Sequence, residues 1–236
     1  MKPSLTVGVL GGLGPAATLD FFGKVLKATG ARTDQEHLHV VVNCNPHVPN
    51  RNEAIAGRGP SPGPALGAGA AALERAGADF VVMVCNTAHA WQADIEAALS
   101  VPFVSLIDET VAEVQKTPSI CRVGVLATSG CVGAKLYQRA FHVAGIEAIV
   151  LGSEDMERFM ACIYAVKSGD TGSHQRAEMK ALATLLRARG ADAIIAACTE
   201  VPLVLSEADV DGPLISSTDV LVHRTVERAR HGALTP

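Results

Sequence analysis

Two of the six cysteines occupy equivalent places in the chain, because each follows an apolar run and opens a polar turn. Cys85 begins the turn CNTAH at residues 85–89, and Cys198 begins the turn CTEVP at residues 198–202. A thiolate can remove a proton from carbon, and a thiol can deliver one. Two such groups on opposite faces of one carbon are what inversion of that carbon requires. The pair predicts two-base proton transfer at a stereocentre.

An internal repeat supports reading the two cysteines together. The segment VGVL at residues 7–10 recurs at 123–126, and GAD at 77–79 recurs at 190–192, each time followed by an apolar run and a cysteine. The matching order and nearly equal spacing indicate a duplicated unit. We predict one lobe over residues 1–115 that carries Cys85 and a second over 116–236 that carries Cys198. A C-terminal helix after about residue 216 is expected to cross back onto the first lobe.

Apolar runs of strand length alternate with helical patterns along the chain. The predicted helices at Thr18–Thr29, Lys135–Ala144 and Ser173–Arg189 lead into Gly30, Gly145 and Gly190. The predicted strands are Leu5–Leu10, Leu38–Asn43, Phe80–Val84, Val101–Leu106, Val123–Ala127, Ala148–Leu151, Ala193–Ala197 and Leu214–Ser216. This alternation predicts an α/β fold of two pseudo-symmetric lobes, each a mostly parallel sheet flanked by helices.

Such a fold also predicts where a ligand binds. In open α/β sheets ligands bind beyond the carboxyl ends of the strands, which places the active site in the cleft between the lobes, with one thiol from each. A helix that starts after each turn would point its N–H groups at the cleft. That field would lower the pKa of a thiol and hold a carboxylate.

Composition narrows the class of partner. Hydrophobic residues make up 48% of the 236 residues, and the net charge is −4 without a basic stripe, so nucleic acid is not an expected partner. No apolar run approaches the roughly 20 residues that cross a bilayer. Glycines between Gly8 and Gly14 argue against a signal peptide. We expect a cytoplasmic protein with free thiols, no membrane association and a small-molecule ligand.

Three other interpretations fit the sequence less well. Cys85 with His89, and Cys44 with His47, have spacings seen in zinc sites, but no third ligand is evident. The loop GGLGPAA at residues 11–17 partly matches a dinucleotide fingerprint, yet no acid ends the second predicted strand. Inert packing accounts for Cys121 and Cys162, which lie outside the repeat, but not for a cysteine at both equivalent positions.

The motifs together resemble the aspartate racemase branch of the aspartate/glutamate racemase superfamily. Those that carry the likeness are GGLGPAAT at residues 11–18, PNR at 49–51, SPGP at 61–64, CNTAH at 85–89, IYAVKSG at 163–169 and CTE at 198–200. They follow the order of that family from about Val7 to Pro202. The resemblance implies a homodimer and catalysis without pyridoxal phosphate or metal.

The same resemblance implies roles for individual residues. Cys85 and Cys198 would be the acid/base pair. Arg51 and Lys167 would bind a substrate carboxylate, for which Arg offers a planar fork and Lys a point charge. The α-carboxylate would lie on Asn86, Thr87 and Thr199, and the ammonium group on Glu200. Gly12 and Thr128 complete the predicted substrate-binding set.

Some positions depart from the family pattern. Asn50 replaces an aspartate that often precedes the arginine, and Cys131 stands where threonine is usual. The acid and serine that cell-wall glutamate racemases carry in the first glycine loop are missing, which disfavours that activity. Aspartate is therefore the first predicted substrate, with glutamate or a broader set also open. The remaining alternatives are a maleate isomerase, a hydantoin racemase-like enzyme and a non-catalytic small-anion binding protein.

Overall fold

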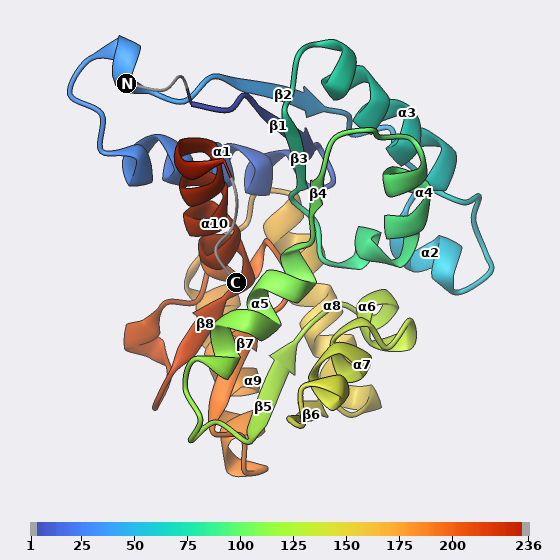
Figure 1. Ribbon diagram of the computed structural model, residues 1–236. Helices are drawn as coiled ribbons and strands as arrows, with labels where there is room; N and C mark the ends of the chain where they lie inside the picture. The colour runs from blue at the N-terminus through green and yellow to red at the C-terminus, as the bar shows by residue number, and fades with distance from the viewer. Residues whose placement is uncertain (1–3, 233–236) are drawn as a thin grey trace.

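The computed structural model describes residues 4–232, and two four-stranded parallel sheets form its framework (Figure 1). The first lobe contains the sheet β2-β1-β3-β4, and the second lobe contains the sheet β6-β5-β7-β8. The strands are β1 Val7–Gly11, β2 Val40–Cys44, β3 Phe80–Met83, β4 Phe103–Val104, β5 Arg122–Leu126, β6 Glu147–Val150, β7 Ala193–Ala196 and β8 Leu214–Ser216. The two strand orders are equivalent, which confirms the predicted fold class.

Helices cover the faces of both sheets. They are α1 Pro15–Thr29, α2 Arg51–Ile55, α3 Gly63–Arg75, α4 Gln92–Ala97, α5 Leu106–Gln115, α6 Ser129–Gly133, α7 Leu136–Val143, α8 Ser153–Lys167, α9 Ser173–Ala188 and α10 Ser217–His231. Short 3₁₀ helices are η1 Asp34–Glu36, η2 Thr87–Trp91, η3 Val201–Leu203 and η4 Glu207–Asp209. None of the helices described within residues 4–232 is both long and apolar enough to cross a bilayer.

One predicted strand is much shorter than expected. The pattern at 101–106 predicted a strand to Leu106, but β4 has only two residues. The side chain of Ser105 accepts a hydrogen bond from the backbone N–H of Asp108 and so caps a helix that begins at Leu106. The cap therefore ends the strand early.

The repeated VGVL segment has a packing reason. Alternate residues of each central strand enter cores on the two sides of the sheet, so the strand is apolar throughout. The glycine within each segment lies beneath a neighbouring helix and strand. A Cβ on Gly8 would come within 2.9 Å of the Ala78 Cβ, and one on Gly124 within 2.7 Å of Ile194 Cδ1. Glycine is required at both positions for close packing.

The last helix of each half packs on the sheet of the other half. Helix α5 contributes Ile107, Val111 and Val114 to the core beside the second sheet. Helix α10 contributes to the core beside the first sheet and packs across α1 (Figure 1). The two helices also contact each other, with Arg224 Nε 2.9 Å from Glu109 Oε2. The predicted division of the chain into lobes at residue 115 stays a prediction. Helix α5 precedes that boundary in the sequence, yet it packs beside the second sheet.

Candidate active site

The carboxyl ends of the central strands of both sheets converge on one small cavity of about 20 Å³. Its lining includes Cys85 after β3 and Cys198 after β7, which are 8% and 6% exposed. The remaining lining residues are Leu13, Arg51, Asn52, Asn86, Thr87, Thr128, Lys167, Thr199 and Glu200. Every residue predicted for the site is therefore in this central cavity except Gly12, which lines an adjoining pocket of about 190 Å³.

A chain of polar contacts leads away from the second thiol. The Sγ of Cys198 donates to Glu200 Oε2 at 3.1 Å, and Glu200 Oε1 forms an ion pair with Lys167 Nζ. The Glu200 side chain is only 3% exposed, and Lys167 is the cation paired with it. Burial opposes the charge on Lys167, but the negative charge of Glu200, with that of the two cysteines in their thiolate form, outweighs it and raises the pKa of the lysine. The site therefore holds a cation close to both sulfurs.

The expected lowering of both thiol pKa values by helix N-termini is wrong for Cys198. Burial raises the pKa of the Cys198 thiol well above its ordinary value, Glu200 raises it further, and Lys167 only partly opposes them. Each cysteine leads into a 3₁₀ helix, η2 or η3, and η3 has only three residues. Such a short segment has too few aligned peptide dipoles to offset burial and a neighbouring carboxylate.

Arg51 donates three hydrogen bonds to backbone carbonyls. Its Nη1 donates to the carbonyls of Val48 and Pro49, both at 3.1 Å, and its Nη2 donates to the carbonyl of Leu13 at 2.7 Å. Lys167 Nζ also donates to that Leu13 carbonyl, at 3.3 Å. The two predicted carboxylate-binding cations thus meet at one carbonyl of the loop after β1.

Hydroxyl and amide groups join the two lobes across the cavity. The hydroxyl of Thr87 in the first lobe lies 2.7 Å from that of Thr128 in the second. Within the second lobe, Thr199 Oγ1 donates to Glu200 Oε2 at 3.3 Å. The Asn86 side chain is occupied elsewhere: its Oδ1 accepts from Tyr137 at 2.6 Å and its Nδ2 donates to Ser217 at 3.2 Å. These two bonds fix the orientation of the Asn86 side chain.

Two residues in the lining were not predicted. Leu13 acts through its carbonyl, and a backbone acceptor leaves no mark on residue type. Asn52 Oδ1 accepts a hydrogen bond from the backbone N–H of Gly130 at 3.0 Å and thereby links α2 to the second lobe. In the sequence, its position directly after the predicted binding residue Arg51 was the feature that could have identified Asn52 as part of the site.

The glycine loop has a steric role beside the site. Gly12 has φ of +83°, and a Cβ there would overlap the backbone of Asn45. A Cβ on Gly14 would overlap Glu200 Oε1. The missing side chain at Gly14 therefore leaves room for the Lys167–Glu200 pair against the loop.

The zinc interpretation of Cys85 and His89 does not fit the geometry. His89 Nδ1 lies 2.8 Å from the carbonyl oxygen of Cys85, and His89 Nε2 accepts from the backbone N–H of Leu106 at 3.1 Å. Both ring nitrogens are in use, so neither has a lone pair directed at a metal beside Cys85.

Comparison with known proteins identifies the family of the chain. The family model described as Asp/Glu/Hydantoin racemase matches residues 10–225. The chain belongs to this family. RacX of Bacillus subtilis, a broad specificity amino-acid racemase, is 30% identical over 224 residues, covering 93% of this chain and 96% of RacX. Membership supports isomerase activity of the racemase type.

Solved structures of the family share the architecture. The aspartate racemase of Picrophilus torridus has a TM-score of 0.86 and 31% identity, with 95% of this chain and 94% of that chain covered. An aspartate racemase homologue from Pyrococcus horikoshii has a TM-score of 0.75 and 24% identity, covering 97% of this chain and 99% of that one. The second likeness concerns the fold alone.

Proposed function

We propose that this racemase-family protein inverts the α-carbon of an amino acid, aspartate first, by two-base proton transfer between Cys85 and Cys198. One observation carries the proposal: thiols from equivalent strand ends of the two lobes line the same cavity, together with Arg51 and Lys167. Two acid/base groups of one kind, related by a duplication, suit a reaction whose two directions are mirror images.

The chemical step needs only proton transfers. One thiolate takes the α-proton, so that the Cα–H bond breaks, an S–H bond forms and the electron pair passes into the α-carboxylate. The other thiol then gives its proton to the opposite face of Cα and becomes a thiolate. Lys167 and the backbone N–H groups of residues 86 and 87 stabilise the charge that develops on the carboxylate. The two sulfurs finish with their protonation states exchanged.

The environment of Cys198 suggests its starting state. Because burial and Glu200 raise the pKa of this thiol, Cys198 begins as the protonated thiol that donates to Cα. In the reverse direction Glu200, which accepts the Cys198 S–H at 3.1 Å, orients the thiol as it gains its proton. The two directions are thus served by chemically different surroundings.

The choice of a dicarboxylate rests on the two cations and on the relatives. Arg51 and Lys167 provide a fork and a point charge for two carboxylates. Asn50 caps α2, since its Oδ1 accepts from the backbone N–H of Asn52 at 2.9 Å, but it lacks the charge of an aspartate. RacX acts on a broad range of amino acids and the Picrophilus torridus enzyme on aspartate, so both ranges need testing.

Substrate entry requires movement of the cavity wall. A cavity of about 20 Å³ is near the size that holds one water molecule, which is too small for an amino acid. Four residues, Leu13, Arg51, Lys167 and Glu200, line both this cavity and the adjoining pocket. We propose that the substrate enters through that pocket, and that its carboxylates replace the Leu13 carbonyl as the partner of Arg51 and Lys167.

The test is racemisation of single enantiomers of a panel of amino acids by the wild type, Cys85→Ser, Cys198→Ser and Cys162→Ser. Cys162 is a matched control because it is also buried but is not one of the residues that line the cavity. We expect the first two variants to lose racemisation and the control to keep it. Turnover of maleate or hydantoins alone, or binding without any turnover, would overturn the proposal. The homodimer stays a prediction, and sedimentation measurements of the molar mass in solution would test it.

A further inference from the structure

The imidazole of His89 connects the turn that carries Cys85 to a helix of the opposite lobe's core. The ring is buried, and its Nδ1 lies 2.8 Å from the Cys85 carbonyl oxygen. Its Nε2 accepts a hydrogen bond of 3.1 Å from the N–H of Leu106, the first residue of α5. The next residues of α5 belong to the core beside the second sheet.

These two partners determine the protonation state of the ring. A backbone N–H can only donate, so Nε2 must carry a lone pair, and a carbonyl can only accept, so Nδ1 must carry the proton. His89 is therefore neutral with a fixed tautomer. Burial lowers its pKa to about 4, in agreement with these contacts.

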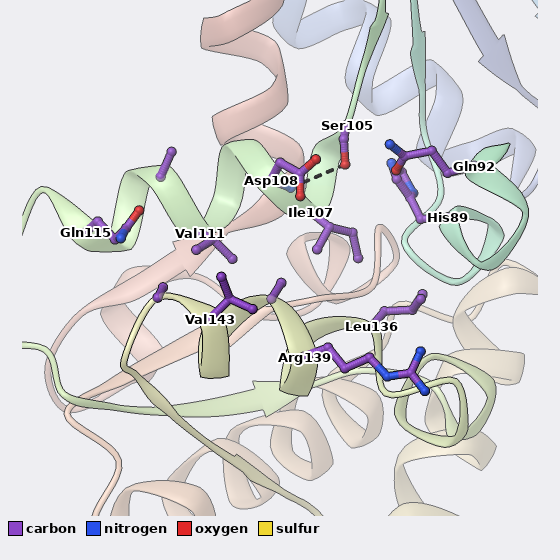
Figure 2. Close-up of a pocket in the computed structure, with 13 residues that line it drawn as sticks. His89, Gln92, Ser105, Ile107, Asp108, Val111, Gln115, Leu136, Arg139 and Val143 are labelled. Carbon is purple, nitrogen blue, oxygen red and sulfur yellow. Dashed lines mark hydrogen bonds between the residues drawn. The ribbon is translucent and has the colours of Figure 1, made fainter. Parts of the chain in front are cut away.

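The surroundings of His89 hold the ring on its remaining sides. The ring of Phe103 lies 5.7 Å away between centroids, and the outer edge of His89 faces a groove of about 520 Å³ that α5 and α7 border (Figure 2). The backbone of the turn is tied down as well, since His89 N–H donates to the Asn86 carbonyl at 3.1 Å. The imidazole thus bridges two elements whose relative position sets where Cys85 lies with respect to the second lobe.

We infer that His89 is a positioning residue, which fixes the Cys85 turn against α5 and thereby aligns Cys85 with a substrate held opposite Cys198. This inference rests on the proposed two-base function. A misplacement of about 1 Å in a reacting group costs on the order of a hundredfold in rate, so a bridge of this kind matters for turnover. Cys198 follows a strand of the other sheet, so loss of the bridge displaces only one of the two bases.

Two variants separate the two halves of the bridge. In His89→Asn the side-chain amide can replace Nδ1–H toward the Cys85 carbonyl but is too short to reach Leu106. In His89→Gln the side-chain oxygen can replace Nε2 as the acceptor for Leu106. His174→Gln is the matched control, because His174 is exposed at the start of α9.

The experiment follows each enantiomer of aspartate in D₂O with the full-length protein, measuring kcat, KM and the configuration of the molecules that gain deuterium. We expect kcat to fall about tenfold to a hundredfold in both His89 variants, with a smaller change in KM. One enantiomer, the substrate of Cys198, should gain deuterium with retention: the misplaced Cys85 no longer completes the inversion, so Cys198 exchanges its S–H for S–D with the solvent and returns deuterium to the same face of Cα. The ratio of retention to inversion does not depend on how much of the variant is folded.

The outcomes separate this inference from the function beneath it. If both His89 variants keep the wild-type kcat and the wild-type ratio of retention to inversion, which we call the partition, the inference is overturned. A loss of activity with unchanged partition for both enantiomers would also overturn it, since that is the pattern of a purely structural role. If instead Cys85→Ser and Cys198→Ser keep racemase activity, the two-base function itself fails, whatever His89 does.

Discussion

Replacing His89 by Gln should change how the stability of the protein depends on pH, because the ring is neutral and buried when the protein is folded. Its pKa is lowered from 6.5 to about 4 by burial, against the charge of Asp108, which favours protonation. Arg139 of α7 lines the same groove as His89. In the unfolded chain the ring recovers its ordinary pKa and binds a proton as the pH falls through 6.5.

The sign and size of the effect follow from this difference. Between pH 6.5 and about 4 the unfolded state binds a proton that the folded state does not, so acidification favours unfolding. The contribution of the neutral His89 ring to the free energy of unfolding is fully present above pH 6.5. Below that pH it falls by about 1.4 kcal/mol for each pH unit of acidification. The total is roughly 3 kcal/mol at pH 4, a large fraction of the stability of a typical protein.

The assay is urea unfolding of the wild type and His89→Gln at a series of pH values from 7 to 4. Other groups titrate in both proteins, so the difference between the two free energies of unfolding isolates His89. We expect the wild type to lose about 3 kcal/mol more than the variant over this range. His174→Gln should follow the wild type. Parallel curves for wild type and His89→Gln would refute the neutral, buried ring.

Three further predictions concern other parts of the site. Glu200→Gln should lower the pKa of the Cys198 thiol, because the carboxylate helps to raise it; the rate of Cys198 alkylation against pH measures this, and an unchanged profile would contradict it. Tyr137→Phe leaves buried Asn86 Oδ1 without its donor and should cost about 1–3 kcal/mol of stability in urea unfolding, against nearly nothing for Tyr164→Phe on the surface. Gly12→Ala should lower the free energy of unfolding by about 1–3 kcal/mol because of its positive φ, and overlap with the Asn45 backbone adds to this loss. The control is Gly30→Ala, where φ is also positive but the space is open. The Gly12 variant must therefore melt at a lower temperature than the Gly30 variant.

The repeat explains why the catalytic pair could be predicted from the sequence. Cys85 and Cys198 stand at equivalent strand ends, and parallel sheets bring such ends to one edge. Their environments could not be predicted in the same way. The raised pKa of the Cys198 thiol depends on how deeply it is buried and on the position of Glu200, and both depend on tertiary packing that residue types and spacing do not state.

Other features escaped because they depend on tertiary partners rather than residue type. His89 suggested a metal ligand through its spacing from Cys85, whereas its ring binds the backbone of Leu106 in a distant helix. Helix α5 has an apolar face in its sequence, yet nothing there states which of two similar sheets that face covers. The length of β4 was decided by the cap at Ser105, which competes with strand formation.

The most direct test of the central claim follows the label in the first turnovers of one pure aspartate enantiomer in D₂O. If two sulfurs act on opposite faces of Cα, the inverted product carries solvent deuterium while the unreacted enantiomer still carries hydrogen. Product that keeps the original hydrogen, or deuterium that appears equally in both enantiomers from the start, would mean that a single base serves both faces.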